Sequence, residues 1–165
     1  MVSGTHVTSF MKDTVVTIAP DALVVDAARK MRDHRIGSVV VAEDGEVCVG
    51  ILTERDIISK AVSLGLDCAA VRVHEIMTSQ LIFATVDDTM EQAQNMMAQN
   101  NIRHLPILSD GKAVGMISSR DAMGYQLNVA YAEIRRSAKL LGDLETRHPG
   151  ISQIQMDSHG RVVFD

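Results

Sequence analysis

Two stretches of this chain place a hydroxyl and a carboxylate three residues apart, each directly after an apolar run. The pairs are Thr53 with Asp56 and Ser118 with Asp121. A structural role is available, because a Thr or Ser that caps a helix and an acidic residue three positions later satisfy two free backbone N–H groups. A ligand-binding role is also available. A carboxylate accepts hydrogen bonds from two neighbouring hydroxyls of a ribose, and a helix N-terminus offers free amides to a phosphate.

An arginine precedes each of these carboxylates. Arg55 and Arg120 are suited to charge-assisted hydrogen bonds with phosphate oxygens. The full strings, 50–56 and 115–121, share a Gly, two apolar residues, a hydroxyl residue, an Arg and an Asp in the same order. Capping alone does not require this string, and its presence twice favours a binding site. Capping and binding are compatible, so both interpretations stay open at this point.

The repeated string belongs to a longer tandem duplication. Asp56 returns as Asp121 at an offset of 65 residues, and positions further upstream return at an offset of 66. A one-residue insertion near Cys48 accounts for the difference. The upstream matches are Met11, Asp21, Met31, Ile36 and Gly45 with Met77, Asp87, Met97, Ile102 and Gly111. A fixed internal period of this kind sets the architecture of the whole chain.

Each repeat predicts the order strand, helix, strand, turn, strand, helix, which is an α/β (α+β) fold. In repeat one, residues 7–63, these are a strand at 14–18, a helix at 23–34, strands at 38–42 and 47–52, and a helix at 53–63. In repeat two, residues 73–124, they are a strand at 81–84, a helix at 89–100, strands at 105–108 and 113–117, and a short helix. Asp21 is expected near the start of the first helix as a cap. Pro106 lacks an amide donor and is expected at a strand edge or an unpaired point.

Three segments lie outside the repeats. Residues 64–72 are a linker, residues 125–148 a C-terminal helix, and residues 151–165 a terminal hairpin. The C-terminal helix carries an apolar stripe with coiled-coil-like spacing of four, three, four and three. The stripe consists of Leu127, Tyr131, Ile134, Ala138 and Leu141.

The composition narrows the function classes. The 165 residues carry a net charge of −5, which argues against a nucleic-acid partner or a polybasic membrane surface. No apolar run approaches the roughly 18 residues of a spanning helix, and no N-terminal signal pattern is present. Cys48 and Cys68 form no CxxC motif, as in a cytoplasmic protein with reduced thiols. The histidines show no metal-ligand spacing, and no catalytic constellation is found, so we expect neither a metal site nor an enzyme.

The motifs resemble those of a tandem pair of cystathionine-β-synthase (CBS) domains, a Bateman module. The resemblance covers about residues 7–124 and is carried by 73–78, 103–107, 50–56 and 115–121. It implies two β-α-β-β-α repeats packed sheet to sheet around a pseudo-two-fold axis. It also implies clefts between the repeats for an adenosyl ligand: AMP, ADP or ATP foremost, with S-adenosylmethionine or NAD(H) as further options. Two such modules commonly pair into a flat homodimer.

The resemblance also implies roles for individual residues. Asp56 and Asp121 match the family's ribose-binding carboxylate, Thr53 and Ser118 a hydroxyl near the phosphate, and Arg55 and Arg120 the phosphate side. Each cleft borrows strands from the other repeat. The residues implied to join Asp121 are Thr17, Ile18, Gly37, Ser38 and Val39. Those implied to join Asp56 are Ala84, Thr85, Arg103, His104 and Leu105.

The two clefts differ in the residues that border them. Small Gly37 and Ser38 leave more room for a base than Arg103 and His104 do, so we expect the Asp121 cleft to bind better. Ser119, where repeat one has Glu54, is the weak point of this expectation. The expected function is a non-enzymatic, nucleotide-sensing homodimer. The alternatives are a structural dimerisation scaffold with empty clefts and a regulatory piece of a larger signalling protein or enzyme.

Overall fold

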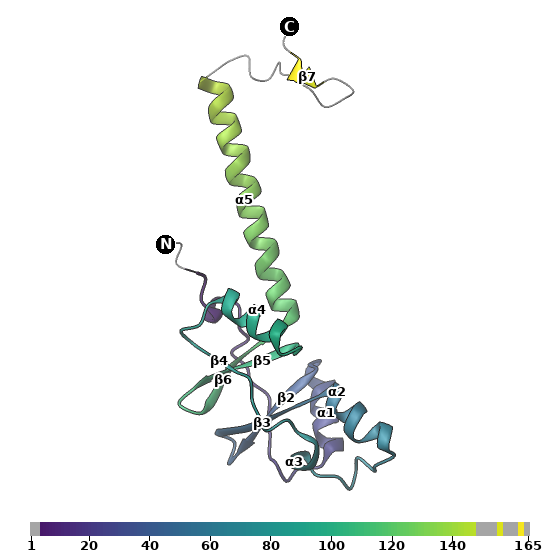
Figure 1. The fold of residues 1–165 in the computed structure, drawn as a ribbon. Coiled ribbons are helices and arrows are strands. Elements are labelled where there is room, and N and C mark those ends of the chain that lie inside the picture. Colours follow the sequence, from purple (N-terminus) through teal and green to yellow (C-terminus); the bar gives the residue numbers. More distant parts are fainter. Residues whose placement is uncertain (1–3, 148–154, 157–161, 164–165) are drawn as a thin grey trace. The chain divides into compact units, whose positions relative to one another are not determined.

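The computed structural model of the chain describes residues 4–147, 155–156 and 162–163 (Figure 1). The chain divides into two compact units, Met1–Met123 and Gly124–Asp165. The elements of the first half are η1 (Val7–Ser9), β1 (Thr17–Ile18), α1 (Val24–His34), β2 (Ser38–Glu43), β3 (Val47–Thr53), α2 (Glu54–Lys60) and η2 (Val62–Leu64). They are followed by α3 (Val73–Ile76), β4 (Ala84–Thr85), α4 (Met90–Gln99), β5 (His104–Ser109), β6 (Lys112–Ser118), α5 (Ser119–Arg147), β7 (Gln155–Met156) and β8 (Val162–Val163).

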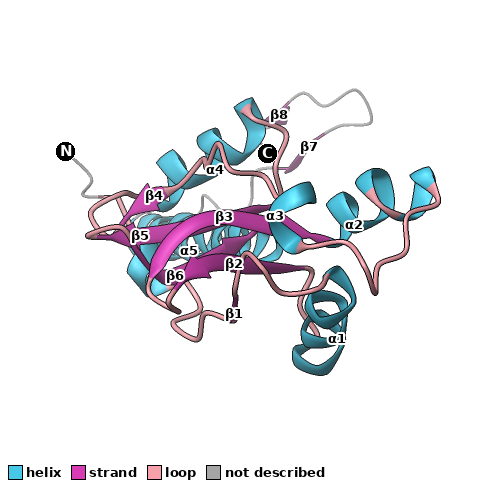
Figure 2. Cartoon of the chain, turned by 90° about the horizontal axis from the view of Figure 1, so that it is seen from below, coloured by secondary structure: helices cyan, strands magenta, loops and turns pink. Residues whose placement is uncertain are grey.

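The strand order of the main sheet displays the duplication. It runs β1-β2-β3-β6-β5-β4, so each strand of one repeat occupies the mirrored place of its counterpart (Figure 2). Within each half, the first two strands are parallel and the hairpin is antiparallel. The halves join edge to edge at one register pair, Val47 with Lys112, where Cys48 N–H donates to Gly111 O at 2.9 Å. The α/β fold class and the two pseudo-symmetric repeats are therefore confirmed.

The hairpin turns form as their residue types predict. Asp44 and Gly45 both have positive φ, at 49° and 74°, and Asp110 and Gly111 repeat this at 50° and 76°. This is the left-handed pair of a two-residue hairpin turn, for which Asp-Gly is among the best sequences. The turns hold β2 against β3 and β5 against β6, and they bring the hairpin tips to the joint between the repeats.

The two repeats exchange their opening segments. Val7 N–H donates to Asp88 O at 2.9 Å, and Lys12 exchanges two 3.0 Å hydrogen bonds with Met116. In the mirrored position, Thr78 exchanges hydrogen bonds of 2.9 and 3.0 Å with Ile51. In Figure 1, α3 accordingly lies with α1 and α2 of the first repeat, while the N-terminal segment lies near α4. Each packed half thus draws its opening segment from the other sequence repeat.

The core follows the same exchange. One cluster of buried residues combines β1, α1, β2, β3 and α2 with Val73 and Ile76 from the start of repeat two. Val73 is fully buried and Ile76 is 5% exposed. Burial of side chains of this size stabilises by about 1.5–3 kcal/mol each. The exchanged segments are therefore part of the core of the half that receives them.

Both first strands are shorter than the sequence predicts. Repeat one was expected to pair over 14–18 and repeat two over 81–84, but β1 is Thr17–Ile18 and β4 is Ala84–Thr85. Val40 N–H donates to Val16 O at 3.0 Å, whereas the equivalent position in repeat two is Pro106, which has no N–H. Pro106 lies inside β5 rather than at an edge, opposite Met116, whose N–H and C=O both bond to Lys12. The proline thus occupies an unpaired point of the strand, which is the second of the two placements expected for it.

Helix boundaries show three further differences. α1 begins without a side-chain cap, at Leu23 instead of Asp21, because linker carbonyls of Cys68 and Val71 accept its first two N–H groups at 2.9 and 3.0 Å. The helix expected at 53–63 ends at Lys60 and is followed by η2, because the chain leaves α-helical geometry at Ala61. α5 runs unbroken from Ser119 to Arg147, so the short helix of repeat two and the C-terminal helix are one element.

The described part of the C-terminal segment contains one pair of short strands. β7 and β8 pair antiparallel, Gln155 with Val163 and Met156 with Val162, as expected of a terminal hairpin. The remainder of 151–165 lies outside the described residues. No helix among the described residues combines the length and apolar character that a membrane span requires.

The packing of Met11 on Gly115 generates a first prediction. A Cβ atom at Gly115 would meet the Met11 Sδ atom and lie 3.0 Å from Met11 Cγ. Since overpacking costs about 1–3 kcal/mol, Gly115→Ala should lower the free energy of unfolding by that amount in urea titrations. In a Met11→Ala background the same change should cost clearly less. An equal cost in both backgrounds would show that the Met11 contact is not what requires glycine.

Candidate functional site

The two hydroxyl–carboxylate pairs cap the helices that follow them. Thr53 N–H and Oγ1–H donate to Asp56 Oδ2 at 3.0 and 2.6 Å, and Asp56 N–H donates back to Thr53 Oγ1 at 3.1 Å. Ser118 N–H donates to Asp121 Oδ2 at 2.8 Å and its Oγ–H donates to the same oxygen. Each carboxylate therefore uses one oxygen for the cap and holds the other oxygen away from it.

Capping alone does not mark a site in this chain. Thr89 and Gln92 form a capping box at the start of α4, with Thr89 N–H donating to Gln92 Oε1 at 2.8 Å and Gln92 N–H donating to Thr89 Oγ1 at 3.2 Å. Neither residue lines the cavities that contain Asp56 and Asp121. The cap is a local device that this chain uses repeatedly, and the surroundings of Asp56 and Asp121 set them apart.

Asp121 lies in a cavity of about 480 Å³ between the two repeats. This volume falls in the roughly 300–1,000 Å³ range of small-molecule sites. The lining residues are Lys12, Thr14, Val15, Val16, Met31, Arg32, Arg35, Ile36, Gly37, Ser38, Glu54, Arg103, His104, Met116, Ser118, Ser119, Arg120 and Asp121. The apolar and backbone surfaces come mainly from repeat one, and the helix start comes from repeat two.

Asp56 lies in a second, smaller cavity of about 160 Å³. Its lining residues are Ile51, Thr53, Arg55, Asp56, Thr78, Gln80, Ile82, Asn101, Ile102, Arg103 and His104. These are largely the repeat equivalents of the residues around Asp121. Lys12 corresponds to Thr78, and Arg35 corresponds to Asn101. The pseudo-two-fold axis thus generates two related cavities, and divergence between the repeats has changed their charge and size.

Ten of the fifteen predicted site residues line a cavity. Around Asp121 these are Gly37, Ser38, Arg103, His104, Ser118, Arg120 and Asp121 itself; around Asp56 they are Thr53, Arg55, Asp56, Arg103 and His104. Arg103 and His104 were expected only with Asp56, but they border both cavities.

The other predicted positions line neither cavity. Ile18, Val39, Ala84 and Leu105 are buried in the core, each no more than 5% exposed. The Thr17 carbonyl accepts a hydrogen bond from Lys30 at 2.7 Å. Thr85, named with the Asp56 cleft, instead donates its N–H and Oγ1–H to Asp88 Oδ2 in the turn before α4.

Several lining residues were not foreseen. Thr14, Val15 and Val16 take the place that was expected for Thr17 and Ile18, because the chain enters the cavity before it pairs with β2. Lys12 and Arg35 were also missed. The duplication could have revealed them, because aligning the two repeats pairs Lys12 with Thr78 and Arg35 with Asn101. Each pair lies on matched walls of the two cavities.

The Asp121 cavity is strongly basic. Five Lys or Arg residues line it against two carboxylates, Glu54 and Asp121. Arg32 pairs with Asp33 at 2.7 Å, but the other four make no ion pair with any described residue. Unpaired cations that converge on one cavity favour an anionic ligand, and guanidinium groups suit phosphate oxygens in particular.

Gly37 and His104 form the contact between the two repeats at this cavity. A Cβ atom at Gly37 would lie 3.2 Å from both His104 Cε1 and Glu54 Oε2, so only glycine leaves the approach uncrowded. Their neighbouring backbone bonds are also symmetric: Glu54 N–H donates to Gly37 O at 3.0 Å and Ser119 N–H to Arg103 O at 2.9 Å. The side chain of His104 is thus held against the wall of the cavity.

Burial lowers the pKa of His104 below its ordinary value of 6.5. The positive charges of Arg103 and Lys12 act in the same direction, while Glu54 and Asp121 oppose the shift. At neutral pH the imidazole is therefore uncharged, and it offers one N–H donor and one acceptor.

Comparison with known proteins identifies the fold. The CBS domain model matches residues 7–63 and again 73–128. The chain belongs to the CBS domain family. Members with this arrangement are CBS domain pairs, which are regulatory modules, and no catalytic family is indicated. The two matched segments coincide closely with the two halves of the duplication.

Individual relatives give the same result. Protein MK0525 of Methanopyrus kandleri is 37% identical over 110 residues, which cover 66% of this chain and 56% of that protein. The solved CBS domain structure of NE2398 is 36% identical with a TM-score of 0.70, covering 74% of this chain and 98% of that chain. The CBS domain pair of protein MJ0100 is 25% identical with a TM-score of 0.68, over 73% of this chain and 98% of that chain. That pair was solved with 5′-methylthioadenosine and S-adenosylmethionine.

Metal-binding geometry was not found in the described part of the chain, where no three His, Cys, Asp or Glu side chains gather in a way that suits an ion.

The lowered pKa of His104 predicts a pH dependence of stability. The unfolded chain takes up the His104 proton first as the pH falls, so stability contributed by the neutral ring is present above about pH 6.5 and is lost below it. We expect the His104→Asn variant to lose less free energy of unfolding than the parent between pH 7 and 5. NMR titration of His104 Cε1–H supplies the direct check, and an inflection at or above 6.5 would contradict the assignment.

Proposed function

We propose that this chain is a non-catalytic regulatory module that binds an adenine nucleotide in the Asp121 cavity and works as a homodimer. The observation that supports this proposal is the cavity itself. It has about 480 Å³ of space, a carboxylate at a helix start, and more basic than acidic side chains. MJ0100 indicates that a CBS domain pair of this fold can hold an adenosyl compound. AMP, ADP and ATP are the ligands that the charges favour.

Each part of an adenine nucleotide has a matching surface in this proposal. The ribose hydroxyls donate to Asp121 Oδ1, which has no partner among the described residues, while Oδ2 keeps the cap. Arg120 and Lys12 are placed to take phosphate charge. The base lies against aliphatic side chains such as Val16 and Ile36, since no Phe, Tyr or Trp side chain lines the cavity.

The charge balance separates the phosphate-bearing ligands from S-adenosylmethionine. The sulfonium group of S-adenosylmethionine is a cation, and it would enter a cavity that already carries more Lys and Arg than Asp and Glu. Phosphate groups instead gain attraction from every unpaired guanidinium. NAD(H) also carries a diphosphate and stays an alternative. Its second nucleoside makes it larger than an adenine nucleotide and therefore harder to fit in the 480 Å³ cavity.

A ligand in this position is expected to act by a population shift. It contacts Arg35 and Gly37 from repeat one together with Ser118 and Asp121 from repeat two. A ligand that bridges two parts stabilises the arrangement in which both sets of contacts form. The response would then be a change in the balance between arrangements of the two repeats, not a chemical step.

The second partner that we propose is another copy of this chain. On α5, Leu127 is 55% exposed, and Tyr131 and Ile134 are each 64% exposed, along the stripe with coiled-coil spacing. Such a stripe needs an equally long apolar helix opposite it, and an identical α5 supplies one. Exposed apolar residues also occur around the end of α2, where Ile58 is 62% exposed.

Two alternatives remain distinct from this proposal. A dimerisation scaffold would form the dimer but bind no nucleotide. A regulatory piece of a larger protein would bind nucleotide and pass the response to another domain, an arrangement that fits a match covering 56% of MK0525.

Isothermal titration with ATP, ADP, AMP, S-adenosylmethionine and NADH tests the nucleotide proposal. Asp121→Asn should weaken adenine-nucleotide binding by roughly tenfold or more, because charge-assisted hydrogen bonds contribute about 1.5–3 kcal/mol each. Asp56→Asn is the matched control, since it alters the equivalent cap but leaves the Asp121 cavity intact. Equal losses in both variants would point to general cap damage, and no binding by the parent chain would favour the scaffold.

Analytical ultracentrifugation tests the homodimer. The parent chain should sediment with about twice the 18.0 kDa protomer mass. Ile134→Glu, on the stripe, should shift the equilibrium toward monomer by placing a charge in an apolar seam. Ala132→Glu adds the same charge on nearly the opposite side of the helix and should leave the dimer intact. A monomeric parent, or a dimer that tolerates Ile134→Glu, would remove α5 from the interface.

A further inference from the structure

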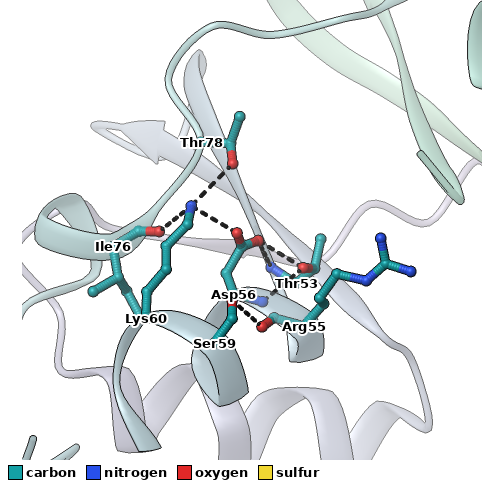
Figure 3. A network of polar contacts seen from close by, with 7 residues as sticks. All are labelled: Thr53, Arg55, Asp56, Ser59, Lys60, Ile76 and Thr78. Carbon is teal, nitrogen blue, oxygen red and sulfur yellow. Dashed lines mark hydrogen bonds and ion pairs between the residues drawn. The ribbon is translucent and has the colours of Figure 1, made fainter. Parts of the chain in front are cut away.

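The Asp56 carboxylate has an ion-pair partner within its own helix, and Asp121 does not. Lys60 Nζ lies 2.7 Å from Asp56 Oδ1, one turn further along α2 (Figure 3). The Asp56 side chain is only 13% exposed, whereas that of Lys60 is 42% exposed. Four residues after Asp121 the chain has Tyr125, and no described Lys or Arg pairs with Asp121.

Three acceptors hold the Lys60 ammonium group in place. Besides Asp56 Oδ1, Lys60 Nζ donates to Ile76 O at 2.9 Å and to Thr78 Oγ1 at 3.4 Å. An ammonium group has three N–H donors, so all three have a partner. Ile76 ends α3 and Thr78 pairs with Ile51, so the exchanged segment of repeat two supplies two of the three acceptors. Figure 3 shows Lys60 reaching across to this segment while the Arg55 guanidinium points away from Asp56.

The acceptor count at Asp56 leaves little for a ligand. Oδ2 accepts two hydrogen bonds from Thr53, and Oδ1 accepts one from Lys60. A carboxylate has about four lone-pair positions, so one is left for a ribose that presents two hydroxyl donors. At Asp121, Oδ2 carries the equivalent pair from Ser118, and Oδ1 keeps both of its positions. The Asp56 cavity is also smaller, at about 160 Å³.

We propose that Lys60, which pairs with Asp56 Oδ1 without lining the Asp56 cavity, occupies the acceptor that a ribose would need there and so limits the chain to one nucleotide. This inference rests on the proposed nucleotide binding at Asp121. Lys60 is then a specificity-determining residue, because its ammonium group donates to the Asp56 oxygen that would otherwise accept hydrogen bonds from a ligand. The divergence from Lys60 to Tyr125 between the repeats makes the two cavities functionally unequal.

The decisive experiment measures the stoichiometry of ATP and AMP binding by isothermal titration. The parent chain should bind one nucleotide per chain. Lys60→Ala removes the cation and opens space beside Asp56, so it should raise the affinity of the second site by roughly tenfold or more and the stoichiometry to two. Lys60→Arg keeps a cation at the same place and should stay at one.

A set of combined variants tests the role of Lys60 separately from nucleotide binding at Asp121. Asp121→Asn alone should bind poorly, and Lys60→Ala added to it should restore one site, which a further Asp56→Asn should remove. A parent that binds two nucleotides, or a Lys60→Ala variant that still binds one, overturns the role of Lys60 while leaving nucleotide binding in place. No binding by the parent and by every variant overturns both proposals.

A measurement on the parent chain keeps the inference testable if Lys60→Ala does not fold. The side-chain NMR signals of Lys60 should stay unchanged at saturating nucleotide, because the ion pair is outside the occupied cavity. Signals of Arg120 and His104 should shift in the same titration. A Lys60 signal that shifts in step with saturation would show that nucleotide displaces the ion pair, and the proposal would then be wrong.

Discussion

The reciprocal exchange of the opening segments is the constraint on which the rest of this structure depends. Lys12 pairs with Met116, and Thr78 pairs with Ile51, so each half of the sheet carries a segment from the other repeat. Val73 and Ile76 then complete a core that repeat one does not complete alone. Because the same segments lead directly into the cavity walls, both cavities are built from both repeats. A ligand bound there necessarily contacts both.

Helix capping and ligand binding use different atoms of the same carboxylates. In Asp56 and Asp121, one oxygen accepts from the N–H and the hydroxyl of Thr53 or Ser118, and this fixes the orientation of the second oxygen. Thr89 and Gln92 show that a capping box also forms away from these two cavities. What distinguishes a site is therefore the environment of the second oxygen. Around Asp121 that environment is roomy and basic, and around Asp56 it contains Lys60.

Local patterns in the sequence predicted the helices, the hairpins and the capping contacts of Asp56 and Asp121, because each depends on residues close together in the chain. The α1 helix and the Asp-Gly turns are of this kind. The features that were missed depend on distant partners. α1 has no side-chain cap because the linker carbonyl of Cys68 satisfies one of its amides, and no local signal at Asp21 reveals this. The entry of Thr14 into the cavity likewise depends on where β1 begins to pair with β2, which alternating residues alone do not specify.

The duplication explains why two similar cavities need not have the same function. Pseudo-symmetry preserves the backbone that shapes both, including the matched bonds from Glu54 to Gly37 and from Ser119 to Arg103. Side chains are free to diverge on that shared frame. Lys12 and Arg35 add positive charge to the Asp121 cavity. The equivalent positions of the Asp56 cavity hold the uncharged Thr78 and Asn101. Lys60 pairs with Asp56 beside the smaller cavity but does not line it. A basic side chain thus keeps its charge available to an anion where no carboxylate pairs with it, as at Lys12 and Arg35, and has that charge compensated where one does, as at Lys60.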